Sequence, residues 1–90
     1  MNDGKWVLYI LECRDKTLYT GITNDLQKRL EAHRLGTGAK YTRGRSPLIL
    51  RYTEICKDRA HASCREWEVK QLTKAEKLLL CEKGTDDGGE

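Results

Sequence analysis

Apolar residues occupy both alternating faces of the segment from Trp6 to Cys13, WVLYILEC. Because side chains of a strand alternate between the two faces of its sheet, this pattern predicts a central strand that is covered on both sides. A polar turn at residues 14–16 follows, and residues 17–23, TLYTGIT, are typical of an antiparallel hairpin partner. Gly21 weakens this second strand, so it indicates a bulge or a close approach to the backbone.

The hairpin leads into a predicted helix and then a loop. Asn24 is the expected cap of the helix, since its side chain can accept a backbone N–H and Gln27 follows three residues later. Asp25 would lie in the first turn, where negative charge complements the helix dipole. Gly36 supplies the end of the helix. Residues 36–47 are rich in glycine and basic residues and contain the one proline of the chain, so they predict an exposed loop.

The second half of the chain predicts one strand and two helices. Residues 48–56, LILRYTEIC, fit a third strand, and Asp58 is the expected cap of a helix that runs to about residue 72. Thr73 and Glu76 have the spacing of a capping box, which predicts a further short helix. The expected order is therefore β-β-α-β-α-α. This is an α/β (α+β) fold with a three-stranded antiparallel sheet flanked by helices.

The length and composition of the chain limit the size of the core. Its 90 residues, 38% of them hydrophobic, allow one domain with a modest core. There is no Phe, so the two Trp and four Tyr are expected to help fill that core. We assign residues 1–81 to the domain and the polar, glycine-rich residues 82–90 to a disordered acidic tail.

Neither a membrane span nor a secretion signal is visible in the sequence, which predicts a cytoplasmic protein without a membrane partner. In that reducing compartment, cysteines are expected to remain thiols and to pack as small apolar groups. A zinc site that uses His33 or His61 is disfavoured, because the spacings resemble no pattern of zinc ligands. The cysteines concerned are Cys13, Cys56, Cys64 and Cys81.

Positive charge is concentrated between residues 28 and 51, where seven basic residues face a single acidic residue, Glu31. Such a segment suits a polyanionic partner, since each neutralised phosphate releases condensed counterions. A solvated basic surface without a partner explains the same charges.

Five polar side chains are candidates for chemistry. Tyr9 and Tyr19 lie on the two strands of the hairpin and can share one face of the sheet. Arg29 and His33 are four residues apart, so they share one face of the first helix, and Glu66 lies in the second helix. Together they can supply a proton acceptor, a phosphate clamp and a ligand for a hard cation. Each also has an ordinary structural explanation as a core residue, a helix cap or a surface ion pair.

The five candidate residues and several short segments around them form a pattern with a defined order and spacing. The segments are Tyr9-Ile10-Leu11 preceded by Leu8, Tyr19-Thr20-Gly21, Arg29 ten residues after Tyr19, His33 one turn later, residues 38–45, and Glu66-Trp67-Glu68-Val69-Lys70. Over residues 7–80 the chain resembles the GIY-YIG nuclease domain, most closely the small stand-alone GIY-YIG proteins of bacteria.

The resemblance implies a catalytic role for each of the five side chains. It implies one Mg²⁺ (or Mn²⁺) ion bound through Glu66, with Glu68 as a less favoured ligand. Arg29 would hold the scissile phosphate, and one of the tyrosines would deprotonate or orient the attacking water. We prefer Tyr9 for this role over Tyr19, and His33 could instead relay protons.

The expected activity is metal-dependent hydrolysis of DNA, structure-selective or weakly specific, in repair or recombination. The partner is DNA, with RNA left open, and a targeting protein could supply specificity. A non-catalytic nucleic-acid-binding module with the same fold is the alternative, and an interaction adaptor is a third interpretation. The residues expected to contact nucleic acid are Lys28, Arg34, Lys40, Tyr41, Thr42, Arg43 and Arg45.

Overall fold

The computed structural model describes residues 5–36 and 47–82. Its strands and helices follow the predicted order β-β-α-β-α-α. The elements are β1 Trp6–Glu12, β2 Leu18–Thr23, α1 Leu26–Arg34, β3 Ile49–Cys56, α2 Arg59–Lys70 and α3 Lys74–Glu82. The predicted loop at 36–47 and the predicted tail at 82–90 fall almost entirely outside the described residues.

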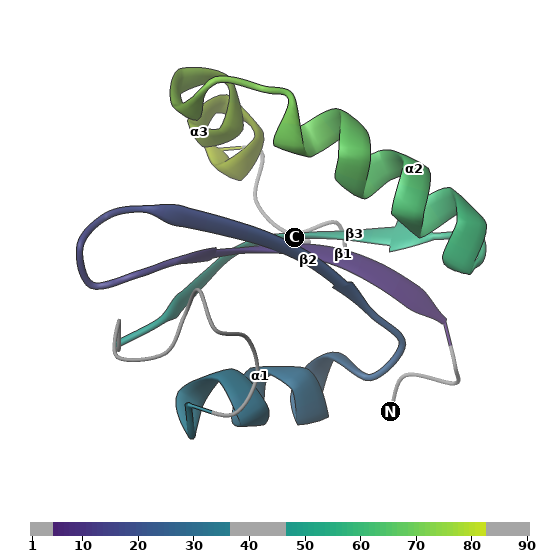
Figure 1. Cartoon of the computed structure of the whole chain (residues 1–90), viewed down its shortest axis with the longest axis horizontal. Helices are drawn as coiled ribbons and strands as arrows, with labels where there is room; N and C mark the ends of the chain where they lie inside the picture. Colours follow the sequence, from purple (N-terminus) through teal and green to yellow (C-terminus); the bar gives the residue numbers. More distant parts are fainter. Residues whose placement is uncertain (1–4, 37–46, 83–90) are drawn as a thin grey trace.

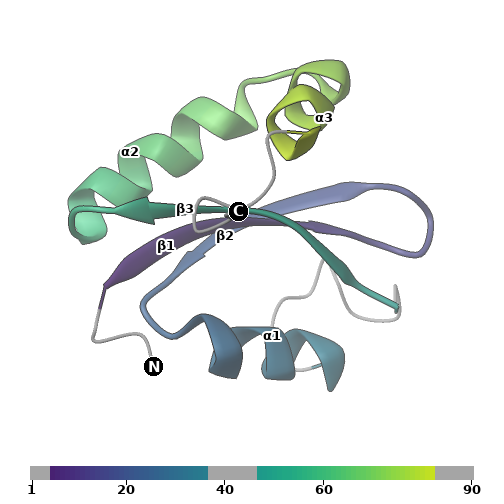
Figure 2. The same ribbon diagram turned by 180° about the vertical axis from the view of Figure 1, so that it is seen from behind.

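The three strands form one antiparallel sheet in the order β2-β1-β3, so β1 is the central strand as predicted. Helix α1 covers one face of the sheet, whereas α2 and α3 cover the other (Figures 1 and 2). In the register between β1 and β2, Tyr9 lies opposite Gly21 and Leu11 lies opposite Tyr19. Directly opposed residues point to the same face, so all four belong to the face under α1.

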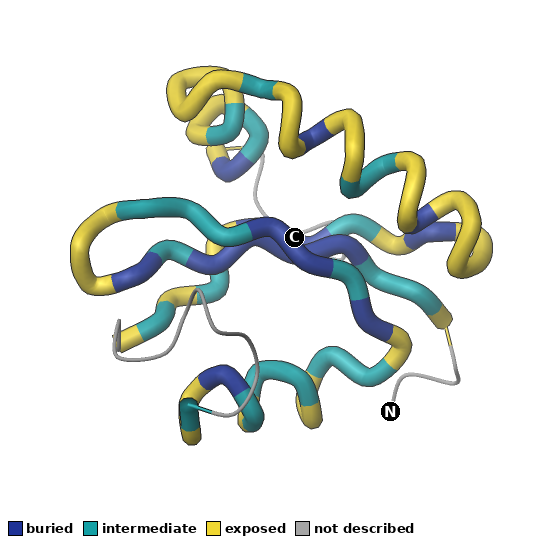
Figure 3. Tube along the Cα trace, in the orientation of Figure 1, coloured by how far each residue is buried: buried dark blue, intermediate teal, exposed yellow. Residues whose placement is uncertain are grey.

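The apolar core lies between the sheet and the helices α2 and α3. Leu8 and Ile10 of β1 are fully buried there, together with Ala62 and Val69 of α2. Burial is concentrated in the central strand and on the inner faces of the helices (Figure 3). No helix in the described part of the chain is long and apolar enough to cross a membrane.

Two expectations about the core are wrong. The side chain of Trp67 is 66% exposed, and Cys64 is exposed as well, whereas the other three cysteines are buried. Both residues lie on the outer side of α2, because Ala62 and Val69 define its inner side and the helix turns by about 100° per residue. None of the four cysteines forms a disulfide.

Helix α1 is capped by Asp25, so the prediction of Asn24 is wrong by one residue. A carboxylate oxygen of Asp25 accepts the backbone N–H of Lys28 at 3.2 Å. The N–H of Asp25 in turn donates to the Thr23 hydroxyl at 3.0 Å. This contact with the last residue of β2 places the cap at position 25, and Asn24 is left exposed.

The predicted caps of α2 and α3 are confirmed. The carboxylate of Asp58 accepts the N–H of His61 at 2.8 Å. The capping box is reciprocal, since the N–H of Thr73 donates to Glu76 at 2.8 Å and the N–H of Glu76 donates to the Thr73 hydroxyl at 3.2 Å. Helix α2 ends at Lys70, two residues before the predicted boundary.

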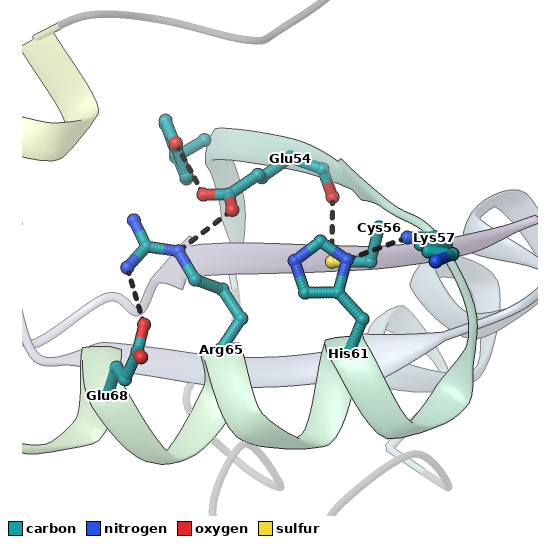
Figure 4. A network of polar contacts seen from close by, with 7 residues as sticks. Glu54, Cys56, Lys57, His61, Arg65 and Glu68 are labelled. Carbon is teal, nitrogen blue, oxygen red and sulfur yellow. Dashed lines mark hydrogen bonds and ion pairs between the residues drawn. The ribbon is translucent and has the colours of Figure 1, made fainter.

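An ionic network fixes the rotation of α2 over the sheet (Figure 4). Arg65 Nε donates to the carboxylate of Glu54 on β3 at 2.8 Å, and its Nη1 donates to Glu68 at 3.1 Å. The hydroxyl of Tyr52 also donates to Glu54, at 2.8 Å. Burial, and then the hydrogen bond to the Glu54 carboxylate, raise the pKa of Tyr52 to about 12. Because a helix turns by about 100° per residue, the next residue, Glu66, points away from the contact that Arg65 makes with β3.

The position of the α1 cap can be tested by paired substitutions. Asp25→Ala removes the acceptor for a backbone N–H, so we expect it to lower the free energy of unfolding by about 1 kcal/mol. Asn24→Ala should change it by less than about half that amount, since Asn24 is exposed and caps nothing in the structure. Urea unfolding of both variants measures the difference. Equal losses, or a larger loss for Asn24→Ala, would contradict the assignment of the cap.

Candidate active site

The site is built around the ring of Tyr9, which lies across Gly21 of the neighbouring strand. A Cβ atom at position 21 would lie 2.6 Å from the Tyr9 hydroxyl and 2.7 Å from its Cζ. Any side chain there would displace the ring, so glycine is required by this close approach. The sequence left open a bulge or a close approach, and the structure supports the second. The irregularity in the sheet lies instead between Ile10 and Leu11, in the pairing of β1 with β3.

Helix α1 supplies two partners for the Tyr9 hydroxyl. His33 Nε2 lies 2.8 Å from it, and Arg29 Nε donates to it from 3.3 Å. The spacing of four residues puts Arg29 and His33 on the helix face that is turned toward the sheet. His33 is 1% exposed and is the buried residue of α1. His33 is therefore a core residue of α1 that also contacts the central strand.

Tyr19 completes the cluster from the edge strand β2. Its ring centroid lies 6.3 Å from that of Tyr9 and 5.3 Å from that of His33, and the rings of Tyr19 and His33 meet edge to face. Tyr9 is fully buried, whereas Tyr19 and Arg29 are half-buried. The two side chains that solvent can reach are therefore Tyr19 and Arg29, with Tyr9 and His33 packed behind them.

The electrostatics of the cluster follow from this burial. Desolvation raises the pKa of Tyr9, although the hydrogen bond from Arg29 opposes the shift. Hydrogen bonding to Tyr9 raises the pKa of Arg29, with smaller contributions from Tyr19. Desolvation and the nearby charge of Arg29 lower the pKa of His33. At neutral pH, Tyr9 is thus a neutral phenol, His33 is a neutral imidazole and Arg29 is a cation.

Glu66 lies on α2, which covers the opposite face of the sheet. Its side chain is 25% exposed, and its carboxylate lies 3.1 Å from Lys70 Nζ. Its negative charge is the smallest of the contributions that raise the pKa of Tyr9. Glu68 is turned elsewhere, since it is 59% exposed and pairs with Arg65. In residues 5–36 and 47–82, no three His, Cys, Asp or Glu side chains gather into a metal-binding group.

The residues predicted to contact nucleic acid are only partly described. Lys28 is exposed on α1, and Arg34 pairs with Glu31 on the same helix. The other five (Lys40, Tyr41, Thr42, Arg43 and Arg45) lie outside the described residues.

The sequence did not predict a hollow that adjoins the cluster on the α1 side. It has a volume of about 830 Å³ and includes His33 in its wall. Its other walls come from α1, from β1 and from the segment that leads into β3, which are far apart in the sequence, so no local pattern could have indicated it. Its lining includes Leu11, Leu30, Pro47 and Leu50.

Comparison with known proteins gives the family of the chain. The model of the GIY-YIG catalytic domain matches residues 5–78, and the chain belongs to this nuclease family. Curated relatives include the UPF0213 protein of Clostridium perfringens, 52% identical over 73 residues, which cover 81% of this chain and 78% of that protein. The UPF0213 protein of Haloquadratum walsbyi is 49% identical over 86 residues, which cover 96% of both chains.

Two solved structures share the fold. The solution structure of the UPF0213 protein BH0048 of Bacillus halodurans is 41% identical, with a TM-score of 0.58 over 89% of this chain and 85% of that one. The protein EF2693 of E. faecalis is 38% identical, with a TM-score of 0.61 over 88% and 85%. The resemblance drawn from the motifs and the predicted fold class are both confirmed.

The burial of His33 predicts a specific dependence of stability on pH. Its pKa in the folded chain lies below the ordinary value of 6.5, so the unfolded chain binds the proton more tightly. The stabilising contribution is complete above about pH 6.5 and is lost as the pH falls through the folded pKa of His33. We expect His33→Gln to remove this loss, because the amide stays neutral.

Urea unfolding between neutral and mildly acidic pH measures this effect. His61→Gln is the matched control, since it replaces the exposed histidine of α2 and leaves His33 in place, so the loss of stability attributed to His33 should persist. The explanation is wrong if His33→Gln and the wild type lose stability in parallel on acidification.

Proposed function

We propose that the chain hydrolyses phosphodiester bonds in DNA with the help of one divalent cation held by Glu66. The observation that carries this proposal is the convergence of Tyr9, Tyr19, Arg29 and His33 on the face of the sheet that α1 covers, and the charge of Glu66 also acts on Tyr9. Apolar packing does not require this convergence, since the main core lies on the other face of the sheet.

The residues fit a hydrated hard cation. Mg²⁺ keeps several of its water ligands in proteins and is commonly bound through one or two carboxylates together with substrate phosphates. Glu66 offers one carboxylate that is partly accessible to solvent, and Lys70 is its present counter-ion. A cation bound there would stabilise charge on a phosphate oxygen and activate a water molecule.

Arg29 is suited to hold the scissile phosphate. Its guanidinium carries five N–H donors, of which Nε is bonded to Tyr9, and this bond fixes the plane of the group. The raised pKa of Arg29 keeps it cationic. A fixed cation at this point offsets the charge that develops on the phosphate in the transition state.

The contact with the attacking water is assigned to Tyr19, which reverses the preference drawn from the sequence. Tyr9 is 0% exposed and its hydroxyl is engaged by His33 and Arg29, so a water molecule does not reach it without displacing one of them. Tyr19 is half-buried beside the guanidinium, so its phenol oxygen can accept a hydrogen bond from the attacking water and orient that water toward the phosphate held by Arg29. Tyr9 then positions Arg29 through its hydrogen bond to Nε, and His33 holds the Tyr9 hydroxyl in place.

The metal assignment is tested with two glutamates of the same helix. Glu66→Gln should reduce Mg²⁺-dependent nicking of branched or flapped DNA by at least about 100-fold, since it removes the charged ligand. Glu68→Gln should leave the rate within about two-fold, because Glu68 faces away and pairs with Arg65. Both variants should bind DNA with similar affinity in EDTA.

Three results of this assay are informative. Equal activity of the Glu66→Gln variant and the wild type would refute the metal assignment. Binding of DNA by a wild-type protein that never nicks it would favour the non-catalytic binding module. Cleavage selective for branched DNA would support the proposed place in repair or recombination.

A further inference from the structure

Helix α2 presents a contiguous group of four side chains around the proposed metal ligand. The group consists of Ser63, Glu66, Trp67 and Lys70. Each is three or four residues from two others, so the four side chains form a diamond in which neighbours lie side by side on the helix surface. Glu66 forms the corner nearest the sheet, and Trp67 forms the corner nearest solvent. The ion pair of 3.1 Å between Glu66 and Lys70 confirms this arrangement along one side.

The indole of Trp67 lies outside the apolar core of the described residues. Its side chain is 66% exposed, whereas Trp6 is partly buried against the core and lies under the guanidinium of Arg59. A single exposed apolar residue is ordinary on a protein surface and would carry no inference alone. Here the exposed ring adjoins a carboxylate and an ammonium that belong to the proposed catalytic site.

The charges along this side of α2 suit a nucleic-acid backbone. Arg59 lies one turn before Ser63 on the same side, where its guanidinium stacks over the ring of Trp6, and Lys70 lies one turn after Glu66 and pairs with it. The backbone positions of the two basic residues are about 16 Å apart along the helix axis at 1.5 Å per residue. An aromatic ring between cations that track a phosphate backbone is the usual arrangement for binding single strands.

We propose that Trp67 stacks on an unpaired base next to the scissile phosphate, so that the substrate is DNA with a single-stranded segment. This inference rests on the proposed function, since it uses the same site. A duplex keeps its base faces stacked inside and offers the indole no partner, whereas a single strand exposes them. A second copy of the chain is the less suitable occupant, because it would bring the cations Arg59 and Lys70 against identical charges.

The test compares the affinity of single-stranded and duplex DNA by fluorescence anisotropy in EDTA, where no turnover occurs. Trp67→Ala should weaken binding of labelled oligothymidylate by about 5- to 150-fold and change binding of a random-sequence duplex by less than about two-fold. Trp67→Phe should retain most of the affinity, since a phenyl ring also stacks. Leu79→Ala is the matched control, because Leu79 is a similarly exposed apolar residue, at 60%, on α3.

Loss of affinity for both DNA forms by the same factor, or for neither, would overturn the assignment of Trp67. A nicking assay separates this failure from a failure of the proposed function. If the wild type never nicks DNA but Trp67→Ala loses single-strand affinity selectively, the base contact is supported and the nuclease function is refuted. If the wild type nicks DNA and Trp67→Ala binds oligothymidylate normally, the base contact alone is wrong.

Discussion

The hydroxyl group of Tyr9 is the contact on which the arrangement under α1 depends. It lies 2.8 Å from His33 and accepts from Arg29, so one buried oxygen joins the central strand to two positions of the helix. Within the described residues, His33 is the one fully buried residue of α1, so this contact lies at the centre of the helix's packing against the sheet. In a buried setting, loss of the hydroxyl would leave the imidazole nitrogen without its partner, and such unsatisfied groups are costly. The same oxygen therefore serves both the docking of the helix and the geometry of the site.

The two faces of the sheet carry different kinds of residues. On the side of α2 and α3, Leu8 and Ile10 pack against Ala62 and Val69, and this apolar core supplies stability. On the side of α1, alternate residues of the same strands place phenols beside an arginine and a histidine. Side chains of a strand alternate in direction. The seven residues of β1 therefore place apolar core residues on one face of the sheet and the candidate polar cluster on the other.

Glu66 belongs to the stabilising side, yet its charge acts on Tyr9. Tyr9 lies close to the edge strand β2, because Gly21 lets the ring of Tyr9 lie over that strand. The link between Arg65 and Glu54 on β3 holds α2 over the sheet, and Glu66 points about 100° away from Arg65 around the helix. A structural ion pair thus sets the orientation of the proposed metal ligand.

The sequence by itself determined the order of the elements, the central place of β1 and the caps at Asp58 and Thr73, because these depend on local periodicity and on short-range hydrogen bonds. Its motifs also gave the family. It did not determine the burial of Tyr9, the accessible position of Tyr19, the exposed ring of Trp67 or the cap at Asp25. These depend on which face of an element meets another, and on a contact as small as the one between Thr23 and Asp25. The tertiary structure decided them, since distances between residues far apart in the chain are fixed only when the sheet and its helices pack together.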